Sequence, residues 1–242
     1  MELCIFQKGF NYSQDGPGNR LVYHLQGCNL HCPWCSNPEG LALSGGSAFT
    51  TEILLQQILS ARMMFFDGGG VTFTGGEATL QLDSLKELLI LLKQENIHTA
   101  LETNGCSPRL PELFPYVDHL MMDCKHHDPE FHRSITGASC ALTHENIALA
   151  SAAGKKPAVR IPLIGGFNAS REDACKFAEL LCKLGLPGNG TLELLAYHEY
   201  GKDKYGKLGM VYAMTETARI SPETIQVFTT ILRDAGITII HT

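Results

Sequence analysis

Three closely spaced cysteines form the most informative chemical motif in the sequence. Cys28, Cys32 and Cys35 follow a C-x3-C-x2-C spacing inside a segment, residues 27–40, that is rich in glycine, proline and asparagine. Such a segment can fold back on itself and turn three thiols toward one point. Thiolate ligands favour zinc or an iron–sulfur cluster, so the motif predicts a metal centre.

The number of cysteines separates the kinds of metal centre. A structural zinc site or a fully ligated cluster is closed by four protein ligands. Three cysteines on a cubane cluster leave one iron open, and an open iron can hold a substrate. Two alternatives stay open at this point: a zinc site with His31 as the fourth ligand, and a trio of redox-active thiols.

Composition narrows the class of protein. The chain has 242 residues and a formal net charge of −6, which fits one α/β domain of the barrel class and argues against a nucleic-acid partner. No secretory signal is evident and no apolar run approaches bilayer length, so we expect a cytoplasmic protein without membrane contact. Nine cysteines without an export signal argue against a disulfide framework.

Strand and helix patterns alternate along the chain. Short apolar or β-branched runs predict strands over 21–25, 70–74, 97–102, 117–122, 156–164 and 192–196. Apolar residues at helical spacing predict helices over 51–66, 80–95, 146–153, 171–184 and 222–235, with residues 63–66 packed in the core or at the helix end. This alternation predicts a parallel sheet wound with helices, and the lack of repeats or linkers predicts one domain over residues 1–242.

Polar or glycine-rich residues follow the predicted strands. The cysteine segment follows the first strand, and Gly75-Gly76-Glu77 follows the second. The later strand ends carry Glu102, Asp123, Lys125 and His198. Because the carboxyl ends of parallel strands meet at one edge of a sheet, we expect these residues at one site. A Gly-Gly pair alone is a weak signal, and a tight strand-to-helix turn also explains it.

The motifs, in this order, resemble those of the radical S-adenosylmethionine (SAM) superfamily. Within it, the chain is similar to the activating enzymes of glycyl radical enzymes, in the lean pyruvate formate-lyase type. The resemblance covers almost the whole chain and rests on these segments: Asp15-Gly16-Pro17-Gly18, the cysteine segment with Ser36-Asn37-Pro38-Glu39, Gly75-Gly76-Glu77, Glu102-Thr103-Asn104-Gly105, Asp123-x-Lys125, and Tyr197-His198-x-x-Gly201-x-x-Lys204-Tyr205.

The resemblance implies a fold and a reaction. The fold would be a partial (β/α)6 barrel, TIM-like and open on one side. Cys28, Cys32 and Cys35 would hold a [4Fe–4S] cluster whose fourth iron is chelated by SAM. One electron, from a flavodoxin or ferredoxin, would cleave SAM into methionine and a 5′-deoxyadenosyl radical. That radical would take a hydrogen from a backbone glycine of a partner glycyl radical enzyme, while the cofactor supplies the difficult chemistry.

The same resemblance implies roles for individual residues. Gly75, Gly76 and Glu77 would meet the methionyl amine, and Glu102 the ribose hydroxyls. Further cofactor contacts are implied for Trp34, Thr103, Asp123, Lys125, Arg160 and His198, with Lys125 and Arg160 neutralising the methionyl carboxylate. Catalytic roles near the substrate are implied for Asp15, Lys125 and His198, with Asp15 and His198 near the rim of the barrel.

A monovalent cation, sodium or potassium, is also implied beside the methionyl carboxylate. Its ligands would be Glu102, Thr103, the Met121 carbonyl and Asp123. The alternative is that Asp123 simply pairs with Lys125 or Arg160.

The sequence departs from the family pattern in ways that leave the partner open. Ala78 stands where a proline usually follows Gly-Gly-Glu, and Glu102 where an aspartate is common. No cysteine lies between Cys35 and Gly75, so no auxiliary cluster is expected there. Two other functions stay open: a radical SAM enzyme acting on a small molecule, of the deazapurine synthase kind, and a zinc-stabilised binding protein without redox chemistry.

Overall fold

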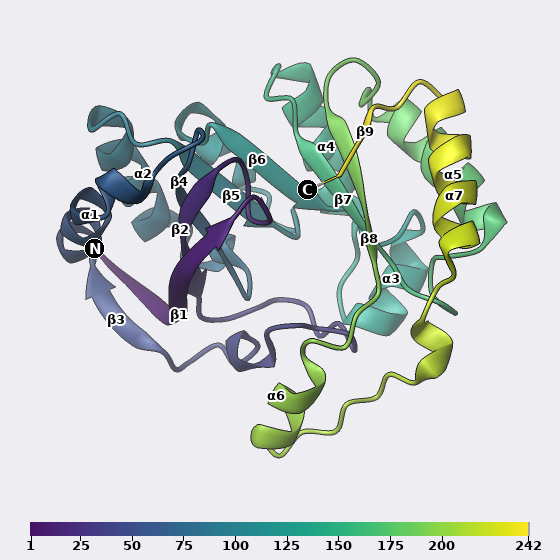
Figure 1. Ribbon diagram of the computed structural model, residues 1–242, viewed down its shortest axis with the longest axis horizontal. Helices are drawn as coiled ribbons and strands as arrows, with labels where there is room; N and C mark the ends of the chain where they lie inside the picture. Colours follow the sequence, from purple (N-terminus) through teal and green to yellow (C-terminus); the bar gives the residue numbers. More distant parts are fainter. Residues whose placement is uncertain (242) are drawn as a thin grey trace.

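The computed structural model describes residues 1–241 and is built around one nine-stranded sheet (Figure 1). The strand order is β3-β1-β2-β4-β5-β6-β7-β8-β9, and β1 runs antiparallel to both of its neighbours. The remaining neighbours pair in parallel. The strands are β1 (Glu2–Tyr12), β2 (Asn19–Leu25), β3 (Ser47–Thr50), β4 (Gly70–Gly75), β5 (Thr99–Thr103), β6 (His119–Asp123), β7 (Ala158–Leu163), β8 (Thr191–Ala196) and β9 (Ile239–Ile240).

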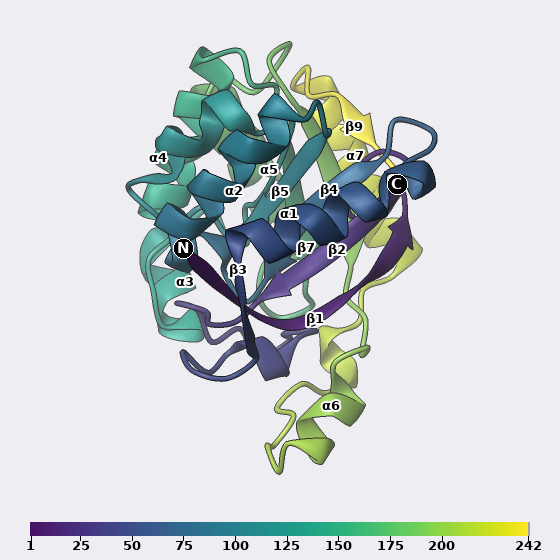
Figure 2. The same cartoon turned by 90° about the vertical axis from the view of Figure 1, so that its left-hand side faces the viewer.

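Helices cover the outer face of this sheet (Figures 1 and 2). They are α1 (Thr51–Ser60), α2 (Leu82–Gln94), α3 (Pro129–Thr136), α4 (Ala141–Ala152), α5 (Arg171–Lys183) and α7 (Pro222–Asp234), while α6 (Lys202–Lys207) lies apart below the sheet. Local chemistry sets their starts: Ser170 and Asp173 form a capping box at α5, and Ser221 caps α7. None of these helices is long and apolar enough to cross a bilayer.

The sheet curls but does not close, because β3 and β9 form its two ends. This confirms the predicted α/β fold with an open partial barrel. The six predicted strands correspond to β2 and β4–β8. The prediction missed β1, β3, β9, α3 and α6, and the helix predicted over 51–66 ends at Ser60. The expected packing of residues 63–66 is wrong for Met63, whose exposed fraction is 92%.

Side chains alternate between the two faces of the strands, as β geometry requires. On β2, Leu21, Tyr23 and Leu25 belong to the main apolar core together with the buried stripe of α2. On the inner face, Ala100, Met121 and Ala158 form a small separate cluster. The polar side chains of the inner face lie nearer the carboxyl ends of the strands, where a cavity opens.

A buried arginine closes the other end of the barrel. Arg20 is fully buried and donates to the Thr72 hydroxyl and the Val71 carbonyl, both at 2.6 Å, and to the Pro17 carbonyl at 3.0 Å. Burial lowers the pKa of Arg20 to about 10, so it stays charged at neutral pH. These bonds hold the loop before β2 against the inner face, and that loop carries Asp15 into the cavity wall.

Candidate functional site

The carboxyl ends of the parallel strands surround a cavity of about 530 Å³. The predicted site residues that line it are Asp15, Cys28, Cys32, Trp34, Cys35, Gly75, Gly76, Glu102, Thr103, Asp123, Lys125, Arg160 and His198. Thirteen residues from separate strand ends and loops therefore share one site. Glu77 is the predicted residue that does not line it.

The cysteine loop presents three thiols to this cavity in a poorly solvated setting. Burial raises the pKa of Cys28 to about 11 and that of Cys32 to about 12. Backbone N–H groups of Leu30 and Asn37 donate to the sulfurs of Cys28 and Cys35, each at 3.4 Å. The thiols are thus neutral by themselves at pH 7, and a bound cation supplies the charge that ionises them.

The spacing of the sulfurs argues against a single zinc ion. Within residues 1–241, three potential ligand atoms lie within 4.8 Å of one another at His126, His127 and Asp173, and the three cysteines do not form such a group. Zinc would hold its sulfurs about 2.3 Å from the metal and hence closer together than that. The proposed fourth zinc ligand, His31, is exposed and does not line the cavity, so the zinc alternative is not supported.

The cysteine loop, residues 27–40, is held by two glycines that pack closely against its backbone. A Cβ on Gly76 would lie 2.1 Å from the Gly27 carbonyl oxygen, so only glycine fits there. From the far end of the chain, Gly201 approaches in the same way: its Cβ would lie 2.3 Å from the Cys35 carbonyl oxygen. The Lys204 ammonium donates to the Asn37 side chain at 3.0 Å. The segment around α6 therefore packs directly on the cysteine loop.

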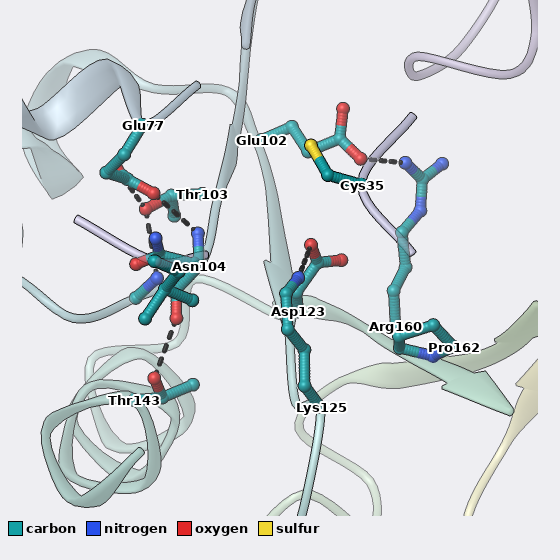
Figure 3. A network of polar contacts seen from close by, with 12 residues as sticks. Cys35, Glu77, Glu102, Thr103, Asn104, Asp123, Lys125, Thr143, Arg160 and Pro162 are labelled. Carbon is teal, nitrogen blue, oxygen red and sulfur yellow. Dashed lines mark hydrogen bonds and ion pairs between the residues drawn. The ribbon is translucent and has the colours of Figure 1, made fainter. Parts of the chain in front are cut away.

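Glu77 does not line the cavity, and its expected contact with a methionyl amine stays a prediction. Its carboxylate is almost fully buried and accepts from both the N–H and the hydroxyl of Thr79, from the Thr103 hydroxyl and from the Asn104 N–H (Figure 3). These bonds cap the 3₁₀ turn Ala78–Gln81 and join the end of β4 to the end of β5. Glu77 thus orients the Gly75-Gly76 backbone and Thr103.

Arg160 is held among acidic and carbonyl groups. Its guanidinium donates to Glu102 at 2.8 Å (Figure 3). It also donates to Glu193 at 2.9 Å and to the Gln14 carbonyl at 2.6 Å. Burial raises the pKa of Glu102, and the Arg160 charge opposes that shift. Each of the two terminal nitrogens of Arg160 keeps a second N–H, so the expected neutralisation of a methionyl carboxylate by Arg160 stays a prediction.

Lys125 supplies the second buried cation of the site. Its ammonium pairs with Asp123 and lies near the cysteine sulfurs. Burial acts against the charge of Lys125, but Asp123 and Cys32 more than offset it and raise its pKa. The pairing alternative for Asp123 is thus the one observed. Asp123 and Glu102 are both ion-paired, but a carboxylate keeps further lone pairs, so the expected monovalent cation stays a prediction.

The two residues expected at the rim both line the cavity. His198 is exposed, and its ring stacks on Tyr200 with centroids 4.1 Å apart. Asp15 is partly buried, and its carbonyl accepts from the Thr72 hydroxyl. The rim position of Asp15 stays a prediction.

A model of the family described as "Radical SAM superfamily" matches residues 22–181. The pyruvate formate-lyase-activating enzyme of Clostridium pasteurianum is 34% identical, over 86% of this chain and 88% of the relative. The pyruvate formate-lyase 1-activating enzyme of Escherichia coli K12 is 32% identical, over 92% of each chain. The crystal structure of a domain of pyruvate formate-lyase-activating enzyme from Bacteroides vulgatus superposes with a TM-score of 0.58 at 29% identity, over 72% of this chain and 98% of that one.

This chain belongs to the radical SAM superfamily. It is an enzyme, and membership of this family implies a [4Fe–4S] cluster and SAM as cofactors. The donor set fits such a cluster, since the three cysteines are free thiols, buried at Cys32 and partly buried at Cys28 and Cys35, and stand wider apart than the ligands of one zinc ion.

Some residues of this radical SAM enzyme's site escaped the sequence analysis. His24 lines the cavity from β2, and it could have been found because it lies on the inward-facing side of the strand leading to Cys28. Asn168 is fully buried and donates to the carbonyls of Lys125 and Pro162, which fixes the Lys125 loop. No sequence signal marks a contact of this kind.

The group formed by His126, His127 and Asp173 is a structural cluster. His126 accepts from the Asp128 N–H through Nδ1, so Nε2 carries the proton that faces the Phe167 carbonyl at 3.2 Å. Both ring nitrogens of His126 are therefore hydrogen-bonded and not free to bind a metal. The Asp173 carboxylate is hydrogen-bonded to the His127 ring and to the Ser170 N–H at the start of α5.

Proposed function

We propose that this enzyme activates a glycyl radical enzyme by removing a hydrogen atom from a backbone glycine of that partner. The observation that carries the proposal is the three-thiol loop at an open cavity, in a chain that matches activating enzymes over about nine-tenths of its length. Among residues 1–241 no strand pair closes the barrel, which leaves space for an extended loop of a protein.

The cofactors would be held by residues at the strand ends. Cys28, Cys32 and Cys35 would bind three irons, the Gly75-Gly76 backbone would meet the methionyl amine, and Glu102 the ribose. When bound and reduced by one electron, the cluster and SAM supply methionine and a 5′-deoxyadenosyl radical, which becomes 5′-deoxyadenosine on taking one hydrogen atom from the glycine.

The protein's own residues orient and shield these groups. Lys125 places a positive charge beside Cys32 and Cys28, which helps to balance the thiolates. Trp34 packs on Phe167, with centroids 4.7 Å apart, and keeps water from the cysteine loop. His198 stands at the mouth, where it can donate to an incoming peptide. The proposal assigns Asp15 to the substrate end of the cavity.

The proposal also covers the domain boundaries, the electron donor and the cellular compartment of the enzyme. We infer one radical SAM domain over residues 1–242, because the described strands all belong to a single sheet. The electron would come from a flavodoxin or a ferredoxin, and the enzyme would work in the cytoplasm. A monovalent cation, sodium or potassium, would be held by Glu102, Thr103, the Met121 carbonyl and Asp123.

The decisive experiment mixes cluster-loaded enzyme, SAM, reduced flavodoxin and a pyruvate formate-lyase under strict anaerobiosis. We expect a carbon-centred doublet on the lyase in the electron paramagnetic resonance spectrum, together with one 5′-deoxyadenosine per radical. If 5′-deoxyadenosine forms with a small molecule alone and no glycyl radical enzyme acquires a radical, the function is that of a metabolite-directed enzyme.

A further inference from the structure

The segment that follows α6 exposes closely spaced apolar side chains. Leu208, Met210 and Val211 have exposed fractions of 46%, 42% and 86%. Single apolar residues are common on protein surfaces, whereas several that gather in one place mark a contact with another molecule. Residues 208–211, hereafter the apolar segment, lie directly after α6, which projects below the sheet (Figures 1 and 2).

The residues after the apolar segment fasten it to the cavity wall. The hydroxyls of Tyr212 and the cavity-lining Tyr197 lie 2.9 Å apart. Met214 packs on the same small apolar cluster as Tyr197 and Trp34, both of which line the cavity. The position of the apolar segment is therefore set by the wall of the site itself.

Tyr200 joins this surface to the mouth of the cavity. Its ring stacks on that of His198, both residues line the cavity, and 79% of Tyr200 is nevertheless exposed. Between Tyr200 and the apolar segment lies α6, whose six residues rise about 9 Å. Exposed apolar surface thus begins at the mouth and is found again one short helix further along the chain.

The charges around the apolar segment are balanced and paired. Residues 199–219 carry four basic and three acidic side chains. Among them, Lys202 and Arg219 both pair with Glu199. A partner that is steered by charge needs an excess of one sign on the surface it meets. Apolar contact is therefore the chemistry that this surface offers, and it fits an apolar patch on a partner protein.

The proposed reaction brings such a protein to the mouth. The substrate glycine belongs to a folded enzyme, so its loop can enter the cavity only when the rest of that enzyme lies over the mouth. The surface beside the mouth is then covered by the partner. We propose that Tyr200 and the apolar segment dock the folded body of the glycyl radical enzyme through apolar contacts, an inference that rests on the proposed function.

The test compares a folded substrate with a short one. The variant Met210→Ser/Val211→Ser removes two apolar side chains that do not fasten the segment to the wall. Met63→Ser/Met64→Ser is the matched control, because these methionines are 92% and 48% exposed and precede β4, at the opposite end of the strands from the cavity. The substrates are intact pyruvate formate-lyase and a short peptide centred on its radical glycine. Dithionite reduces the cluster-loaded enzyme, so that no electron-carrier protein takes part.

We expect Met210→Ser/Val211→Ser to raise the KM for pyruvate formate-lyase roughly tenfold or more, because two apolar side chains no longer gain from burial. The KM for the peptide should stay unchanged, since the peptide reaches the cavity without covering the apolar segment. Electron paramagnetic resonance measures the radical on the lyase, and 5′-deoxyadenosine formation measures the reaction of the peptide. The control variant should match the natural enzyme with both substrates.

Three results would overturn the inference. One is an unchanged KM for the lyase, including a loss that appears only when reduced flavodoxin replaces dithionite, which would assign the surface to the electron donor. Another is an equal loss with the peptide, which would indicate a distorted cavity. The third is a dimer of the natural enzyme that the variant loses, which would assign the surface to a second copy. Failure of the proposed function is distinguishable, because the natural enzyme would then form no radical on the lyase and no 5′-deoxyadenosine with the peptide.

Discussion

Glu77 and Asn104 are joined across neighbouring strands: the Glu77 carboxylate accepts the Asn104 backbone N–H at 2.7 Å. The same carboxylate accepts from Thr79 and Thr103, so it carries four hydrogen bonds in a buried setting. The Gly-Gly-Glu turn is therefore a fixed piece of the cavity wall before any cofactor arrives.

Replacing this carboxylate should lower stability even without cofactors. Glu77→Gln places an amide N–H₂ among donors, so we expect the free energy of unfolding of the cluster-free protein to fall by about 1.5–3 kcal/mol. Urea denaturation measures this, with the exposed Glu179→Gln as control, expected within about 0.5 kcal/mol of the natural protein. Unchanged stability combined with lost SAM binding would instead indicate a direct contact.

Only three of the nine cysteines should matter for the cluster. Cys28→Ala, Cys32→Ala or Cys35→Ala should abolish the cluster, because each removes one of three iron ligands. Cys175→Ala and Cys182→Ala, at exposed positions, should retain about four irons and four sulfides per chain. Iron and sulfide analysis after anaerobic reconstitution decides the matter, and full iron content in any of the first three variants contradicts the assignment.

Gly201 should be intolerant of any side chain. Its Cβ would lie 2.3 Å from the Cys35 carbonyl oxygen, so Gly201→Ala must push α6 off the cysteine loop and should cost about 1–3 kcal/mol. Gly206→Ala, in the same helix, meets nothing within 4 Å and should be neutral or slightly stabilising. Thermal unfolding and the iron retained after gel filtration compare the two, and equal behaviour would show that α6 does not fasten the loop.

The affinity for SAM should fall in acid. Burial raises the pKa of Glu102 and Arg160 opposes it, so the ionised acceptor is lost as pH decreases toward that raised pKa. Arg160→Gln removes the opposing charge and should move the decline to higher pH, whereas Glu193→Gln leaves Arg160 less neutralised and should move it to lower pH. The dissociation constant of SAM measured across pH tests this, and identical profiles for the three proteins would exclude Glu102 as the titrating acceptor.

Acid should also destabilise the fold through buried neutral histidines. Burial lowers the pKa of His119 and of His132 to about 4, below the ordinary value of 6.5. Between those values the unfolded chain binds protons that the folded chain does not, so stability falls as pH decreases from about 6.5 to about 4, by up to about 1.4 kcal/mol per pH unit for each histidine. His132→Gln should reduce this slope in urea titrations at several pH values. A slope equal to that of the natural protein would contradict the role of His132.

Local patterns were sufficient for the parallel strands but not for the elements around them. Residues 21–25, 70–74 and 192–196 are short apolar runs that any sheet buries, and they were predicted correctly. β1 was missed because most of its residues after Ile5 are partly or fully exposed, so its alternation is weak. The six-residue α6 is too short for periodicity and is held by Gly201 and Lys204 against the cysteine loop.

At the site, too, some features follow from local sequence patterns and others depend on contacts with distant residues. Strand-end positions predicted which residues meet at the cavity, since parallel strands bring their carboxyl ends together. The direction of the Glu77 side chain could not be predicted, because it depends on donors from β5. The packing of Asp15 depends on the loop held by Arg20, and the ion pairs of Arg160 with Glu102 and Glu193 depend on strands far apart in the sequence.

The contact between Gly201 and Cys35 has a consequence for how the protein matures. Strand order in the barrel follows chain order from β4 to β9, so a growing chain can add each strand beside the one made before it. The cysteine loop is synthesised early, whereas Gly201, which packs against it, follows Cys35 by more than a hundred and sixty residues. The nascent loop thus stays accessible to cluster-delivery proteins throughout translation, and metal loading can be completed before α6 seals it.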